Sequence, residues 1–141
     1  MTAKEYLRQA YLLDQRINSH IKEKEEIRDM ACSISSPKLG DKVQTSQEGE
    51  APFTRSVFKL LELEKLINEE IDLLVDLKKQ IHDVLEQVEN PDSQMILRYR
   101  YVHNLTWEQI GMKLKIDRAT AIRWHDSALA KVTLPEKPIE I

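Results

Sequence analysis

The sequence predicts an all-α protein. Its 141 residues include only 3 Gly and 5 Pro, too few for the frequent turns of a strand-rich fold, and only 6% of them are aromatic. Apolar residues recur over long stretches at alternating spacings of three and four, the period of a helix with one buried face. The longest apolar run has four residues, so we expect no membrane span and a cytoplasmic location. The single cysteine, Cys32, excludes an intrachain disulfide.

The first helix is expected over residues 3–32, because Ala, Leu, Glu, Lys, Gln and Arg dominate this stretch and no Gly or Pro interrupts it. Its apolar stripe has the three-four spacing of a coiled-coil seam. The members of the stripe are Ala10, Leu13, Ile17, His20, Lys24, Ile27 and Ala31. Two polar residues and two alanines make this seam weak.

The composition of residues 33–52 predicts a flexible linker. They contain two of the three glycines, two of the five prolines and few apolar residues, which show no period. A loop of this length is unusual in a compact domain, so we expect it to tether the first helix rather than join it tightly.

A second, longer helix is expected over residues 53–89. With a rise of about 1.5 Å per residue it would be about 50 Å long, and it needs a partner to bury its stripe. The stripe is Val57, Leu60, Glu64, Ile67, Ile71, Leu74, Lys78, Ile81, Leu85 and Val88. Either the first helix folds back on it, or a second copy of the chain forms a homodimer through residues 57–88. Residues 1–89 therefore form a long helical hairpin or coiled coil.

Residues 90–134 predict a separate cluster of short helices over 92–103, 106–114 and 118–132. Asn90-Pro91-Asp92 ends the long helix, because Pro91 suits the first turn of a new one. Thr106 and Gln109 have the spacing of a capping box, and Asp117 can cap the last helix. The end of the chain, residues 135–141, is expected to be a non-helical tail.

Two short helices joined by a turn of three or four residues predict a helix-turn-helix, with Gly111 allowing the close approach of the second helix. We expect the inner face of the second helix to contain Ala121, Trp124, Ala128 and either Leu129 or Val132. Its outer face would present Arg118 and Arg123 to guanine edges or phosphates, and Ala119 and Ile122 to thymine methyl groups. Lys113 and Lys115 would contact the phosphate backbone. At most one of Arg98 and Arg100 is expected to reach phosphate, the other being a solvated surface charge.

The stretches 94–101, 105–111 and 118–125 resemble the C-terminal promoter-reading domain of sigma factors. More closely, the whole chain resembles small transcriptional regulators of phages and mobile elements of Gram-positive bacteria, which place a coiled-coil region before a sigma-like helix-turn-helix. The resemblance implies sequence-specific binding of double-stranded DNA and regulation of transcription, with Arg118, Thr120 and Arg123 at or near DNA. It also implies a core that consists of Trp107, Ile110, Leu114, Ile116 and Trp124. Lys115 departs from the pattern, because a glycine is usual there.

Two alternatives come from other functional classes. In one, the acidic long helix binds RNA polymerase or another helical partner, and the helix-turn-helix is only a packing unit. In the other, the chain is the small subunit of a phage DNA-packaging machine, which also joins a DNA-binding domain to an oligomerising coiled coil. The four histidines lack metal-ligand spacing and no nucleophile or phosphate-binding motif is present, so we expect no enzyme activity, cofactor or metal.

The formal net charge of −3 is distributed unevenly. Residues 1–89 contain 13 Lys and Arg against 18 Asp and Glu, a net charge of −5, whereas residues 90–134 contain 7 against 4, a net charge of +3. The acidic total therefore does not exclude nucleic acid as a partner. A domain of +3 has a modest nonspecific affinity for DNA, so dimerisation or a protein partner is expected to assist it.

Overall fold

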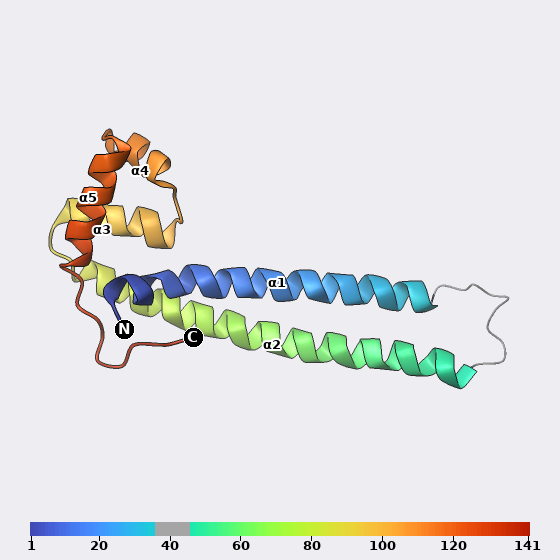
Figure 1. The fold of residues 1–141 in the computed structure, drawn as a ribbon. Coiled ribbons are helices and arrows are strands. Elements are labelled where there is room, and N and C mark those ends of the chain that lie inside the picture. The colour runs from blue at the N-terminus through green and yellow to red at the C-terminus, as the bar shows by residue number, and fades with distance from the viewer. Residues whose placement is uncertain (36–45) are drawn as a thin grey trace. The chain divides into compact units, whose positions relative to one another are not determined.

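The computed structural model is helical, as predicted (Figure 1). It describes the backbone of residues 1–35 and 46–141, and the side chains of residues 1–33 and 53–141. The elements are α1 (Ala3–Ser35), α2 (Ser46–Glu86), α3 (Pro91–Leu97), the π-helical turn η3 (Arg98–Val102), α4 (Trp107–Leu114) and α5 (Arg118–Leu129). The described residues contain no strand, and none of their helices is long and apolar enough to cross a membrane.

Both ends of the linker expected over residues 33–52 are helical, which corrects that prediction. Helix α1 continues to Ser35 and α2 already begins at Ser46, while residues 36–45 lie outside the described part. The Gln, Glu and Ala residues at the start of α2 are good helix formers. Pro52 lies within α2 and does not end it, although a proline inside a helix removes one backbone hydrogen bond.

The chain divides into two compact units. The terminal unit consists of Met1–Asp14 and Leu73–Ile141, and the central unit consists of Gln15–Asp72. In each unit a segment of α1 lies beside a segment of α2 that runs in the opposite direction (Figure 1).

The polar contacts between α1 and α2 follow this antiparallel order. In the central unit His20 lies opposite Glu70, with 2.6 Å between Nδ1 and Oε1, and Lys24 lies 3.9 Å from Glu64. In the terminal unit the Tyr6 hydroxyl donates a 2.7 Å hydrogen bond to the side chain of Gln80. In the central unit the residue number of the partner on α2 therefore falls as the residue number on α1 rises.

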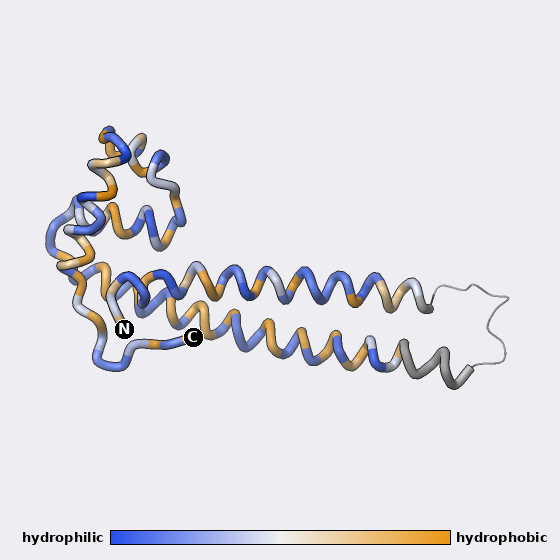
Figure 2. Tube along the Cα trace, viewed as in Figure 1, coloured by the Kyte–Doolittle hydropathy of each residue, from blue (hydrophilic) through white to orange (hydrophobic). Residues whose placement is uncertain are grey.

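The buried stripe of α1 agrees with the prediction, since Ala10, Leu13, Ile17 and Ala31 are buried. The buried stripe of α2 is shifted from the predicted one, so that Glu70 and Leu77 are buried where Ile71 and Lys78 were expected. Its members are Ile67, Glu70, Leu74, Leu77, Ile81, Val84 and Leu85, and Val88 is buried just beyond the end of the helix. Figure 2 shows the alternation of apolar and polar residues along both helices.

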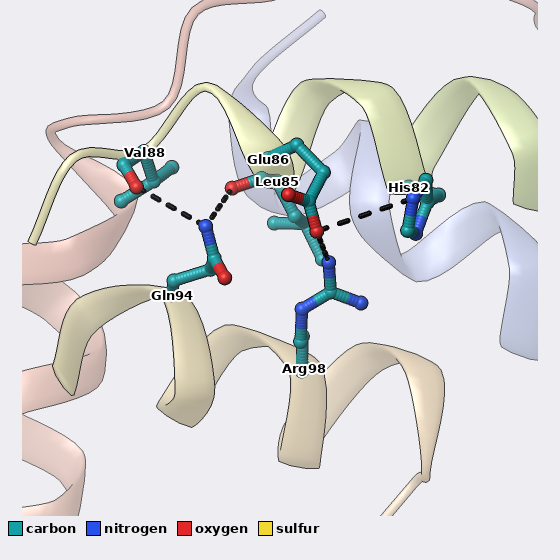
Figure 3. A network of polar contacts seen from close by, with 6 residues as sticks. All are labelled: His82, Leu85, Glu86, Val88, Gln94 and Arg98. Atoms are coloured by element: carbon teal, nitrogen blue, oxygen red, sulfur yellow. Dashed lines mark hydrogen bonds and ion pairs between the residues drawn. The ribbon is translucent and has the colours of Figure 1, made fainter. Parts of the chain in front are cut away.

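Helix α3 is attached to the end of α2 by polar side chains (Figure 3). The Gln94 amide donates to the backbone carbonyls of Leu85 and Val88, at 3.0 and 3.2 Å, and the Leu85 carbonyl also accepts the N–H of Val88. One of Arg98 and Arg100 was expected to be a solvated surface charge. Arg98 is not that residue, because it forms an ion pair with Glu86.

Asn90 caps α3, since its side chain accepts hydrogen bonds from the backbone N–H groups of Asp92 and Ser93, and Pro91 occupies the first turn. The expected helix over residues 92–103 changes character at Arg98, where the π-helical turn begins. In this turn the His103 N–H donates to the Arg98 carbonyl, five residues earlier, which is the hydrogen bond that defines a π-helix.

The tail of residues 135–141 is non-helical, as predicted. Two glutamine side chains hold it against α1 and α2. The Gln9 amide donates to the Ile139 carbonyl at 2.7 Å and accepts from the Ile141 N–H at 3.1 Å. Gln80 accepts from the Ile139 N–H at 3.0 Å, so the last residues pair as a strand would, but with side-chain amides.

Candidate nucleic-acid interface

Helix α4 begins at the predicted capping box. The Thr106 hydroxyl accepts from the Gln109 N–H at 3.2 Å, and the Gln109 side chain accepts from the Thr106 N–H at 2.9 Å. At the other end, Lys115 caps α4 in the left-handed conformation, with φ 58° and ψ 46°. The capping box was predicted from the local sequence, and Lys115 has the positive φ that a glycine adopts more readily.

Gly111 brings α4 directly onto the turn that leads into α5. A Cβ atom at this position would lie 2.7 Å from the backbone oxygen of Ile116, closer than real Cβ contacts come. The Gly111 carbonyl accepts the N–H of Ile116 at 2.9 Å and also that of Lys115. The turn therefore closes tightly, and only glycine fits at this point of α4.

Asp117 caps α5 by accepting the Thr120 N–H at 2.9 Å. Hydrogen bonds from Thr120, first from its side chain and then from its backbone, hold the pKa of Asp117 below its ordinary value. Helix α5 ends at Leu129 rather than at residue 132, because the N–H groups of Lys131 and Val132 bond to carbonyls three residues back and tighten the last turn.

The inner face of α5 contains Ala121, His125 and Ala128. Trp124 was predicted there, but its side chain is 38% exposed, whereas His125 is only 2% exposed. A histidine is buried at this position because both of its ring nitrogens have partners. Nε2 lies 2.6 Å from the Tyr101 hydroxyl, and Nδ1 lies 3.1 Å from the Asp126 carboxylate.

The π-helical turn η3 positions Tyr101 against His125. Burial raises the pKa of Tyr101 to about 12, so its hydroxyl stays protonated at neutral pH. The hydroxyl can therefore donate a hydrogen bond to Nε2 of His125. Burial also lowers the pKa of His125, although the neighbouring Asp126 opposes this shift. Trp107 completes the cluster with its ring edge-on to His125, at a centroid distance of 4.8 Å.

The structure brings the seven predicted contact residues together around the α4–α5 turn, with the side chains of five of them exposed. The exposed residues are Lys113, Lys115, Arg118, Ala119 and Arg123, whereas Thr120 and Ile122 are half-buried. The Arg123 guanidinium donates to the Thr120 hydroxyl at 3.1 Å, which holds Arg123 along the outer side of α5. Arg118 forms an ion pair with Glu108 of α4, with 3.0 Å between Nε and Oε1.

A basic cleft in the terminal unit was missed by the sequence-based prediction. It has a volume of about 480 Å³ and contains no Asp or Glu in its lining. Its cations are Lys4 and Arg8 of α1 and Arg100 of η3. The Arg100 guanidinium lies 4.3 Å from the centre of the Trp107 ring and donates to the Leu105 carbonyl at 2.9 Å. Lys4 and Arg8 are one helical turn apart, but no local pattern connects them to Arg100.

A family comparison covers both units of the chain. Residues 12–133 match the family described as "Protein of unknown function (DUF722)". The chain belongs to the DUF722 family. No curated protein and no solved structure matches it. The matched region begins within α1 and extends through α5 of this chain.

The described polar clusters of this DUF722 chain lack the grouping of a metal site. Among the residues that the structure describes, no three His, Cys, Asp or Glu side chains are grouped so that they could hold a metal ion. The contacts between Tyr101, His125 and Asp126 are those of a packing network. A tyrosine whose pKa is raised by burial is a hydrogen-bond donor at neutral pH and a poor nucleophile.

Proposed function

We propose that the chain binds double-stranded DNA in a sequence-specific manner and regulates transcription. In this proposal residues 1–89 are a helical hairpin, and α4, the turn and α5 are a sigma-like helix-turn-helix, with α5 in the major groove. The observation that carries the proposal is the tight junction at Gly111, together with the exposed cations around it. A close crossing of two short helices is what lets the second one project far enough to enter a groove.

Arg123 is the side chain best prepared for base contact. It lies on the outer side of α5 and is held there by Thr120, so less side-chain freedom is lost when it binds. Ala119 is exposed on the same helix and is small enough to contact a thymine methyl group. Arg118 would exchange its Glu108 partner for a phosphate or a guanine, since the pair is solvent-exposed and therefore weak.

Backbone contacts would come from two groups of cations. Lys113 and Lys115 flank the turn, are exposed and form no ion pair with another described residue. The basic cleft adds Lys4, Arg8 and Arg100 beside the N-terminal end of α4. Helix N-termini and basic side chains are the usual ligands of phosphate oxygens.

The decisive experiment is selection of bound sequences from a random duplex pool by the full chain. An enriched motif would establish DNA reading, and the absence of any enrichment at low salt would refute the proposal. Affinity for a selected site should fall steeply with added salt, since phosphate contacts release counterions. A protein-interaction module that does not bind DNA would show neither result.

A matched pair of variants then tests the orientation of α5. Arg123→Ala should weaken binding to the selected site by about 5- to 150-fold. Lys131→Ala removes the same charge just beyond the other end of α5, where Lys131 contacts Ser93, and should change affinity little. Equal losses for the two variants would mean that bulk charge, not a specific contact, explains binding.

A further inference from the structure

The basic cleft of the terminal unit is large enough for a small organic ligand. Its volume of about 480 Å³ lies within the range of about 300–1,000 Å³ that is usual for small-molecule sites. All of its lining residues belong to Met1–Asp14 or Leu73–Ile141, so a single compact unit forms the whole cleft.

The cations of the cleft have no carboxylate partner. Lys4, Arg8 and Arg100 form no ion pair with another described residue, and no Asp or Glu lines the cleft. Burial raises the pKa of Tyr101 to about 12, and the charges of Arg100 and Arg8 oppose this shift. Burial also lowers the pKa of His125, and the charges of Arg100 and Lys4 act in the same direction. All three cations are therefore close enough to act on one buried pair in the lining, and their positive fields add.

Arg100 is held in position without a ligand. Its guanidinium lies 4.3 Å from the centre of the Trp107 ring and donates to the Leu105 carbonyl at 2.9 Å. A guanidinium has five N–H donors, and the others form no hydrogen bond with a described residue. Its planar fork matches two oxygens of a phosphate group, and a side chain that is already fixed loses little freedom on binding.

Tyr11 and Asn104 extend the cleft beyond its cations. Both are exposed, and neither side chain forms a hydrogen bond with another described residue. The Tyr11 ring is 42% exposed and offers a face on which a planar base can stack. The Asn104 amide both donates and accepts, so it can bond the edge of a base or a sugar hydroxyl. Cations beside an open aromatic ring and an amide suit a ligand that joins phosphate to a flat polar ring.

We propose that the basic cleft binds a nucleotide, with its phosphates at Lys4, Arg8 and Arg100 and its base against Tyr11. A terminal phosphate monoester carries a charge of about −1.5 to −2 at neutral pH, so a nucleoside diphosphate, with about one further charge, balances the three cations. This site does not depend on the proposed DNA binding. Both would use the same cations, so a bound nucleotide would withdraw them from duplex phosphates.

Isothermal titration of the full chain with ADP, in the absence of DNA, tests the site directly. A chelator is present, because the lining offers no carboxylate to Mg²⁺. ADP should bind saturably at one site per chain, and adenosine and citrate should bind at least about tenfold more weakly. Failure of ADP to bind at millimolar concentration would refute the proposal. Equal affinity for citrate would indicate a general anion site and would overturn the choice of a nucleotide.

Exposed positions supply the variants, so that the core is left intact. Arg8→Glu should weaken ADP binding at least about tenfold. Arg16→Glu makes the same change at an exposed position of the same helix outside the cleft, and it should change the affinity little. Equal losses for the two variants would mean that only bulk charge attracts the nucleotide, which would overturn the proposal.

The position of the base is tested with Tyr11→Ala. This variant should weaken ADP binding by about 5- to 150-fold while leaving the affinity for pyrophosphate, which has no base, unchanged within about twofold. Its circular dichroism should match that of the wild type. An unchanged affinity for ADP, or an equal loss for ADP and pyrophosphate, would contradict stacking of the base on Tyr11.

Discussion

Replacing Gly111 by alanine should destabilise the terminal unit, although alanine is the better helix former. The new Cβ atom would lie 2.7 Å from the Ile116 oxygen, and the obstacle is backbone, which cannot swing aside. Overpacking of this kind costs about 1–3 kcal/mol. Displacing the turn also weakens the Ile116–Gly111 hydrogen bond, which adds about 1 kcal/mol. The gain in helix propensity offsets about 1 kcal/mol, so the expected net loss is about 1–3 kcal/mol.

Tryptophan fluorescence during urea unfolding measures this loss selectively. The chain has two tryptophans, Trp107 and Trp124, and both lie in the terminal unit. Circular dichroism, by contrast, is dominated by the long helices α1 and α2. Met112→Ala is the matched control, because Met112 is the next residue of α4 and is 81% exposed, so its loss should change stability by less than about 0.5 kcal/mol.

The reasoning fails if Gly111→Ala stabilises the unit. A gain of about 1 kcal/mol is what helix propensity alone predicts at an open position. That result would mean that α4 and the turn are farther apart than described, and it would remove the structural basis for a tight helix-turn-helix.

Three further predictions concern backbone strain, a polar core pair and a titrating group. Lys115→Gly should raise the stability of the terminal unit by about 1 kcal/mol in the same assay, because glycine adopts the positive φ without strain. Glu70→Leu should lower the thermal midpoint of the chain by leaving His20 without its partner, and the double variant His20→Leu, Glu70→Leu should recover most of the loss. Since burial lowers the pKa of His125, stability should be greatest above about pH 6.5 and should be lost as the pH falls through the lowered pKa; His125→Gln should flatten this dependence in urea midpoints measured across that range.

Helix caps were predictable from the sequence because their hydrogen bonds close within a few residues. Asn90, Thr106 and Asp117 each satisfy backbone N–H groups two or three positions ahead, and all three caps are present. These features need no knowledge of what packs against the helix.

The two incorrect inner faces share one physical cause. On α2 the apolar count favoured Ile71 over Glu70, and on α5 it favoured Trp124 over His125. In both cases a polar residue is buried because a partner from a distant part of the chain satisfies it, 50 residues away for Glu70 and 24 residues away for His125. A prediction from hydrophobic periodicity places such a polar residue on the exposed face, because the pattern contains no information about partners that are distant in the sequence.

The basic cleft was missed for the same reason, because more than ninety residues separate Arg8 from Arg100 in the sequence. Its cations would matter most if residues 90–134, with a formal charge of only +3, bind DNA as proposed. If Lys113, Lys115 and Arg123 alone neutralised phosphates, the salt dependence of binding would have a slope of about −2.7 on logarithmic axes. Adding Lys4, Arg8 and Arg100 would roughly double that slope, and a dimer on two half-sites would double it again. A measured slope near −2.7 therefore indicates a lone α4–α5 contact, whereas a slope of about twice that size indicates help from the cleft or from a second copy.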